Sequence, residues 1–181
     1  MIENFCVLLK RYYRGSSGVS ALEAALMFPV LLTLLLGVYE IGSGIIHNQK
    51  AIRAAQVTAD LLSRERSIND ADITQAMEAA RQAILPLNDA ELGVDVVSVE
   101  YGADSEGNEI ITTLWRETRN MPQDAQVLTQ LSGLGSAGEG ALAVVVSYKY
   151  SPLFSHFAFD EINMREVAFF RPRKSSIVTK Q

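Results

Sequence analysis

A long apolar stretch near the N-terminus constrains this chain more than any other feature. Residues 19–39, VSALEAALMFPVLLTLLLGVY, contain a single charged side chain, Glu23. At 1.5 Å of rise per residue, a helix of this length spans about 30 Å, the thickness of the hydrocarbon layer of a bilayer. Lys10, Arg11 and Arg14 precede it, and basic residues favour the cytoplasmic side. The sequence therefore predicts a single transmembrane helix over residues 19–40, with a cytoplasmic N-terminus.

The position of small residues relative to the apolar stretch bears on whether the stretch is a secretory signal peptide. A secretory signal peptide carries small residues after its apolar core, whereas residues 15–18, Gly-Ser-Ser-Gly, come before it. Residues 42–44, Gly-Ser-Gly, keep removal of a conventional signal open as an alternative. The chain has one cysteine, Cys6, so no intrachain disulfide can form. No apolar region precedes Cys6, which argues against a lipoprotein.

Glu23 is the unusual residue of the apolar stretch, because an ionisable group within a membrane normally has a partner and a function. If the chain is cut after Gly18, Val19 gains a free α-amine and Glu23 becomes the fifth residue. Its carboxylate then lies about one helical turn from the amine of its own chain, and the amine of a neighbouring subunit is a second candidate partner. The helix dipole also favours negative charge there. The alternative is a glutamate that is neutral or reaches the membrane surface.

The segment RGSSGVSALEAALMFPVLLTLLLGVYEIG resembles the TadE/TadF-like minor pilins, or pseudopilins, of tight-adherence (Flp) type IV pilus systems. A basic leader, Gly18, four residues and a glutamate form the signature of prepilin peptidase substrates. Glu23, Pro29 and Glu40 match an acidic residue, an early proline and a second acidic residue that recur in this family. The resemblance covers residues 11–65 well. Beyond them it extends only in outline, through strands and the Y-x-Y-x-P element at residues 148–152.

The resemblance implies a role in assembly rather than catalysis. It implies cleavage between Gly18 and Val19, and an assembly role for Glu23, Pro29 and Glu40, with Pro29 either a neutral kink or a bend suited to filament packing. The expected partners are a prepilin peptidase, other pilin subunits, the pilus assembly platform and the membrane. The expected location is the bacterial cytoplasmic (inner) membrane, with a C-terminal head outside the cytoplasm. The pilus itself is a second expected location.

The helix is expected to continue beyond the membrane. Residues 40–66 contain no proline, and their apolar residues recur at helical spacing, although the glycines at 42 and 44 leave a flexible joint open. The expected organisation is a leader at 1–18, a transmembrane helix at 19–40, a stalk helix at 41–66 and a head at 67–181. The fold class is therefore α+β, with a small antiparallel-sheet head of pilin-like architecture.

The head is expected to contain one further helix and three or four antiparallel strands, with one face of the sheet against a helix. Asn69 or Asp70 caps the helix and Pro86 stops it. A hairpin turns at residues 104–108, a loop or short helix runs from Met121 to about Leu131, and the last strand covers residues 162–170. The apolar faces are expected at Ile73, Ala76, Met77, Ala80 and Ile84 of the helix, and at Val97, Val99, Tyr101, Leu142, Val144, Val146, Tyr148 and Tyr150 of the strands.

Other motifs give little support for a nucleotide-binding, metal-binding or catalytic site. The G-x-G-x-x-G at residues 133–138 lacks the preceding strand and following helix of a dinucleotide site, so a loop is expected. The acidic residues of the hairpin turn at 104–109 lack the calcium-loop spacing. The two histidines, His47 and His156, are far apart in sequence and form no metal motif. A net charge of −5 argues against nucleic acid. We expect no enzyme activity, no cofactor and no metal.

Two alternatives stay open. Phe154, Phe157 and Phe159 follow Pro152 in an expected loop, where they either cover the sheet or contact a partner subunit. The second alternative concerns the whole chain, which would also fit an uncleaved single-pass anchor for a periplasmic scaffold or sensor domain. That reading uses the same membrane segment but gives Glu23 no role.

Overall fold

The computed structural model describes residues 17–153 and 161–181. The chain divides into two compact units, Met1–Gly42 and Ser43–Gln181, and each is treated by itself. One helix, α2 (Ser17–Ser63), contributes to both units and continues without interruption past Pro29 and past the glycines at 42 and 44. The predicted long helix is therefore confirmed, and it ends three residues before the expected limit.

In the second unit, α2 presents a stripe of small residues to the core. Ala51, Ala54, Ala55, Ala59 and Leu62 are all at most 2% exposed. Thr58 on the same stripe donates its hydroxyl to the carbonyl oxygen of Ala54 at 2.9 Å. Small side chains let the helix approach its neighbours closely, so this part of α2 is a core helix of the head.

The second helix of the head, α3 (Asp70–Ile84), begins where the sequence predicts. The Asn69 side chain accepts hydrogen bonds from the backbone N–H groups of Ala71 and Asp72, and the Asp72 carboxylate accepts one from the backbone N–H of Asn69. This reciprocal arrangement is a capping box, which satisfies the free amides of a helix start. The predicted apolar face is confirmed, because its members are the buried residues of α3.

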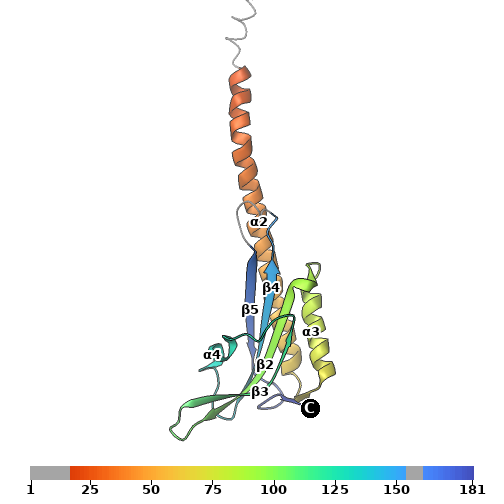
Figure 1. Cartoon of the computed structure of the whole chain (residues 1–181), viewed down its shortest axis with the longest axis vertical. Coiled ribbons are helices and arrows are strands. Elements are labelled where there is room, and N and C mark those ends of the chain that lie inside the picture. The colour runs from red at the N-terminus through yellow and green to blue at the C-terminus, as the bar shows by residue number, and fades with distance from the viewer. Residues whose placement is uncertain (1–16, 154–160) are drawn as a thin grey trace, which may run out of the picture. The chain divides into compact units, whose positions relative to one another are not determined.

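The main sheet has four antiparallel strands in the order β3-β2-β4-β5 (Figure 1). These are β2 (Leu92–Ala103), β3 (Glu109–Arg119), β4 (Gly140–Tyr150) and β5 (Ile162–Phe170). A 3-10 turn, η1 (Asp89–Glu91), leads into β2, and α4 (Val127–Leu131) precedes β4. The antiparallel sheet head is thus confirmed, and the strand order is a feature that the sequence did not reveal.

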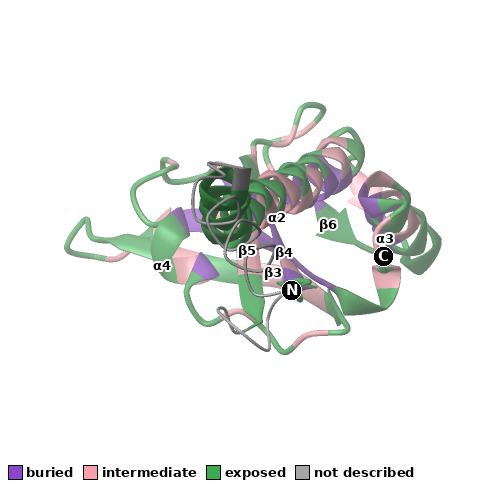
Figure 2. Ribbon diagram, turned by 90° about the horizontal axis from the view of Figure 1, so that it is seen from above, coloured by how far each residue is buried: buried purple, intermediate pink, exposed green. Residues whose placement is uncertain are grey.

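The sheet is covered on both faces, which corrects the expectation of a single covered face. Leu142, Val144 and Val146 of β4 pack with α2 and α3. Val97 and Val99 of β2 lie on the opposite face, with α4. Figure 2 shows buried residues on the sheet and on α2 and α3. The two apolar faces read from the sequence therefore lie on opposite sides of the sheet, because alternation within a strand does not identify which face meets which helix.

A C-terminal segment also enters the core. After β5, the chain reaches β6 (Thr179–Lys180), which pairs in parallel with β1 (Ser67–Ile68). The carbonyl oxygen of Val178 accepts hydrogen bonds from Ser98 Oγ at 3.0 Å and from Trp115 Nε1 at 2.8 Å. Ser98 is consequently buried, although it is a polar residue that alternates with Val97 and Val99.

Candidate membrane and assembly segment

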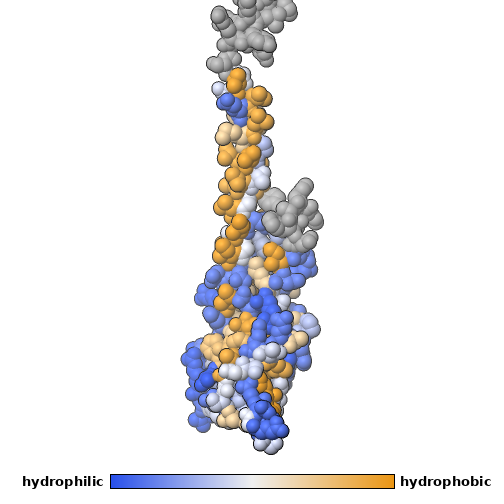
Figure 3. Space-filling model, turned by 90° about the vertical axis from the view of Figure 1, so that its left-hand side faces the viewer, coloured by the Kyte–Doolittle hydropathy of each residue, from blue (hydrophilic) through white to orange (hydrophobic). Residues whose placement is uncertain are grey.

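The N-terminal part of α2 exposes almost all of its apolar surface. Within α2 an 18-residue window has a mean hydropathy of 2.2 and is 0% buried, so the helix is long and apolar enough to cross a membrane. Figure 3 shows these hydrophobic side chains along the helix. The large apolar residues at least 56% exposed here include Val19, Leu22, Leu26, Met27, Phe28, Val30, Leu31, Leu34, Leu35, Val38, Tyr39 and Ile41. In an aqueous environment this apolar surface would be exposed to water, which is unfavourable. The segment therefore indicates membrane anchoring.

The predicted processing site lies in the first turn of α2. The helix begins at Ser17, so the Gly18–Val19 peptide bond is helical in the uncut chain. A Cβ added at Gly18 would meet no heavy atom within 4 Å, and Val19 is 58% exposed. The bond is therefore not covered by the described part of the chain. Cleavage at this bond stays a prediction.

Glu23 projects from the same exposed part of α2. Its side chain is exposed, and it makes no hydrogen bond or ion pair with any residue in the described ranges 17–153 and 161–181. Val19 and Glu23 are four residues apart on one helix, which places them on the same face. The geometry is therefore compatible with pairing between a new Val19 amine and the Glu23 carboxylate.

Pro29 lies inside α2 without ending it. The hydroxyl of Thr33 donates to the carbonyl oxygen of Pro29 at 2.8 Å. Proline has no backbone N–H, so one intrahelical hydrogen bond is missing four residues earlier. Transmembrane helices tolerate this loss.

Glu40 lies on the same helix but far from Glu23. The two acidic residues are 17 positions apart, which corresponds to about 25 Å along a helix. Glu40 is 8% exposed, whereas Glu23 is exposed. The three predicted assembly residues thus share one helix and form no convergent site. Phe154, Phe157 and Phe159 lie outside the described residues.

An aromatic contact in the second unit was not predicted. The His47 ring on α2 lies against Tyr150 and Tyr148 of β4, with ring centroids 4.4 Å and 5.8 Å apart. His47 Nδ1 is 2.7 Å from the carbonyl oxygen of Ser43. The Y-x-Y-x-P element noted in the sequence therefore holds the sheet against α2. Its tyrosines alternate in a strand, which was the available signal, but their helical partner was not readable.

A buried ionic network was also missed. Asp95 is 0% exposed and accepts hydrogen bonds from Arg116 Nε at 3.0 Å and from the backbone N–H of Asp124 at 2.8 Å. The Asp124 carboxylate in turn accepts from Arg165 Nε at 2.6 Å. The hydrogen bond from Arg165 holds the pKa of Asp124 below its usual value. A lone aspartate within the apolar run of β2 was the signal for this network.

The remaining motifs have structural explanations. Residues 133–138 form a loop between α4 and β4, as expected. Gly133 and Gly138 have positive φ angles, and a Cβ at Gly135 would lie 2.2 Å from the Tyr101 ring. Asp104 closes its own turn by accepting hydrogen bonds from the Asn108 backbone and side chain. Within the described residues, no group of three or more His, Cys, Asp or Glu side chains is placed to hold a metal ion.

Comparison with known proteins bears on the N-terminal segment. Residues 18–60 match a family model described as TadE-like protein. No curated protein and no solved structure matches the chain. The match begins at the predicted processing site and covers Glu23, Pro29 and Glu40. The resemblance drawn from these residues is therefore confirmed, and the chain is TadE-like over residues 18–60.

Proposed function

We propose that this chain is a minor pilin or pseudopilin that takes part in the biogenesis of a Flp (tight-adherence) pilus. The observation that carries the proposal is the coincidence of the TadE-like segment, residues 18–60, with a helix whose first half exposes its apolar side chains. Such a helix would act by inserting into the membrane and associating with other helices. The protein works by binding and assembly and is not an enzyme.

Maturation is the first step of this function. A membrane-bound prepilin peptidase removes the basic leader by hydrolysing the Gly18–Val19 bond, while the head lies outside the cytoplasm. Val19 then carries a protonated α-amine at the start of α2. Glu23, one turn away on the same face, neutralises that charge in its own chain or in the next subunit.

Assembly uses the exposed surface of α2. Its large apolar side chains contact lipid before assembly and the helices of other pilin subunits or of the assembly platform afterwards. Packing between helices in a membrane depends on shape and on polar pairs rather than on the hydrophobic effect. Glu23 would therefore select the position of a partner helix, and Pro29 and Glu40 would adjust the fit.

The processing step is tested by replacing Gly18 with leucine in the intact chain. We expect Gly18→Leu to accumulate in the uncut form, measured by electrophoretic mobility and intact mass. Gly37→Leu is the matched control, because a Cβ at either glycine meets no heavy atom within 4 Å. Processing that is equal in both variants would contradict cleavage after Gly18 and would favour the uncleaved single-pass anchor.

The role of Glu23 is tested separately from cleavage. Glu23→Ala should be cut normally but should lose co-purification with pilin subunits and surface piliation. Glu106→Ala, which removes an exposed glutamate of the head, should leave both unchanged. If Glu23→Ala assembles as well as Glu106→Ala does, the pairing role of Glu23 is wrong even where cleavage is confirmed.

A further inference from the structure

We propose that one end of the second unit lies in the headgroup layer of the membrane, through a surface that we call the membrane-proximal rim. Its members are exposed apolar side chains, namely Ile45 (57%), Ile46 (56%), Leu85 (49%), Leu153 (68%) and Ile162 (45%). The proposal depends on membrane anchoring by α2. It goes beyond the proposed function because it assigns the lipid surface as a partner of the head.

The rim residues gather at one end of the sheet. Tyr150 ends β4, and a Cβ at Gly44 would lie 3.8 Å from its ring. Ile162, the first residue of β5, is the register partner of Tyr150. Figure 1 shows the end of β4 beside the start of β5. Leu153 follows Tyr150 by three residues, so these strand ends lie at the level of Gly44.

A second contact ties the end of α3 to α2 at Lys50, six residues beyond Gly44. Lys50 Nζ on α2 donates a hydrogen bond to the carbonyl oxygen of Leu85, the residue that follows α3. Ile46 precedes Lys50 by one helical turn. Side chains from α2, from the end of α3 and from the ends of β4 and β5 therefore surround one end of the unit.

Chain connectivity places this end near the bilayer. Gly44 follows Tyr39, the last residue of the apolar stretch, by five positions in an uninterrupted helix. Five residues of helix extend about 8 Å, whereas the interfacial layer on each side of the hydrocarbon is about 5–8 Å thick. When residues 19–39 span the hydrocarbon, Gly44 to Ile46 lie in or beside the headgroups.

The chemistry of the rim suits that layer. Its members are uncharged, branched apolar side chains that the head leaves exposed. The ammonium groups of Lys50 and Lys149 nearby have partners within the chain, the carbonyl oxygen of Leu85 and the carboxylate of Glu161. Apolar side chains that enter this layer lose part of their contact with water, which is favourable.

The test measures depth in the membrane, with the full chain in vesicles of phosphatidylethanolamine and phosphatidylglycerol. Cys6 is the only cysteine, so Cys6→Ser provides a background in which one nitroxide label is placed at a time. Labels replace Leu153 and Ile162 in the rim and Leu31 in the apolar stretch. Ile110 is the matched control, because it is 45% exposed like Ile162 and lies at the other end of the sheet, opposite Gly102 of β2.

The readout is the ratio of nitroxide relaxation by oxygen, which partitions into lipid, to relaxation by a water-soluble nickel chelate. We expect the ratio at Leu153 and Ile162 to be several-fold above that at Ile110, and below that at Leu31. Equal ratios at Ile162, Leu153 and Ile110, with Leu31 in hydrocarbon, would overturn the rim and leave membrane anchoring intact. A water-like ratio at Leu31 would overturn anchoring and, with it, the rim.

Discussion

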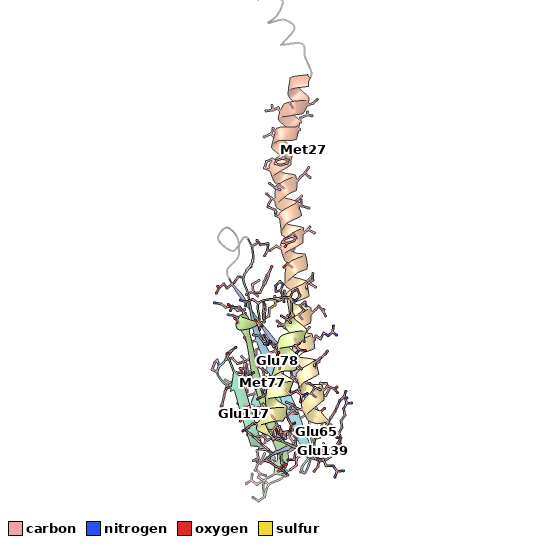
Figure 4. The ribbon with its side chains drawn as sticks, turned by 90° about the vertical axis from the view of Figure 1, so that its right-hand side faces the viewer. Met27, Glu65, Met77, Glu78, Glu117 and Glu139 are labelled. Carbon is pink, nitrogen blue, oxygen red and sulfur yellow. The ribbon has the colours of Figure 1, made fainter. Side chains whose placement is uncertain are left out.

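Met27 and Met77 are methionines on two different helices, and their surroundings differ (Figure 4). Met27 lies on the apolar stretch of α2 and is 60% exposed, whereas Met77 lies on α3 and is 5% exposed. Both helices carry many apolar side chains. In the head these side chains are covered by other parts of the same chain, and in the described part of the first unit they are not.

The two regions treat charge differently as well. The buried carboxylate of Asp95 is paired with Arg116 within the head, whereas Glu23 has no such partner in the part of the chain that the structure describes. Outside the membrane-proximal rim, the core of the head therefore covers its own apolar side chains and pairs the buried Asp95. The apolar side chains of the first half of α2 instead require an apolar environment from outside the chain, which lipid would supply.

The largest effect is expected from breaking the internal ion pair of the head. Arg116→Met leaves Asp95 buried without its charged partner, which costs about 3–5 kcal/mol of unfolding free energy. Lys149→Met removes an exposed pair with Glu161, with side chains 45% and 52% exposed, and should cost about 1 kcal/mol or less. Urea unfolding in detergent, followed by the fluorescence of Trp115, measures both. Equal losses would contradict the buried network.

The methionine pair gives the most direct comparison between the regions. Met77→Ala creates a cavity in the core of the head and should cost about 2–5 kcal/mol. Met27→Ala should leave the urea midpoint of the head unchanged, since Met27 is 60% exposed and its truncation creates no cavity. A comparable shift in both variants would contradict the difference between the two regions.

The capping box of α3 is expected to contribute a smaller part of the stability of the head. Asn69→Ala removes the acceptor for two backbone amides at the helix start and should cost about 1 kcal/mol. Asn69→Asp keeps an acceptor there and should retain most of that stability. Thermal unfolding by circular dichroism distinguishes the two variants. An unchanged midpoint in Asn69→Ala would rule out a stabilising capping box.

The smallest effect is a dependence on pH. The Arg165 hydrogen bond lowers the pKa of Asp124 in the folded head, so the unfolded state binds the proton more tightly. This carboxylate therefore stabilises the head above the unfolded pKa of about 3.9, and that contribution is lost as the pH falls through the lower folded pKa. Asp124→Asn should flatten this part of the stability profile. If the stability profile of Asp124→Asn is as steep as that of the unchanged chain, Asp124 does not contribute to the pH dependence.

Sequence patterns predicted the elements with strong local signals. The apolar stretch, the Asn69 cap and the face of α3 depend on residues close together in the chain, so they were readable. The strand order, the second covered face and the place of the C-terminal segment depend on contacts between distant residues. Ser98 illustrates this limit, because its burial requires Val178, which lies 80 positions away.

The candidate site shows a similar division. Gly18, Glu23, Pro29 and Glu40 were identified from spacing and resemblance, and the described helix includes all four. Their proposed partners are a peptidase and other subunits, so no contact within the described residues bears on their roles. The contact of His47 with Tyr148 and Tyr150 lies within the chain, but it joins elements about 100 residues apart and carries no local pattern.

We propose that cleavage after Gly18 converts this membrane-anchored chain into a mature pilin subunit. Intact mass and N-terminal sequencing of the protein from membranes, with and without the cell's prepilin peptidase, test it most directly. We expect an N-terminus at Val19 only when the peptidase is present. A chain that begins at Met1 in both samples would contradict it.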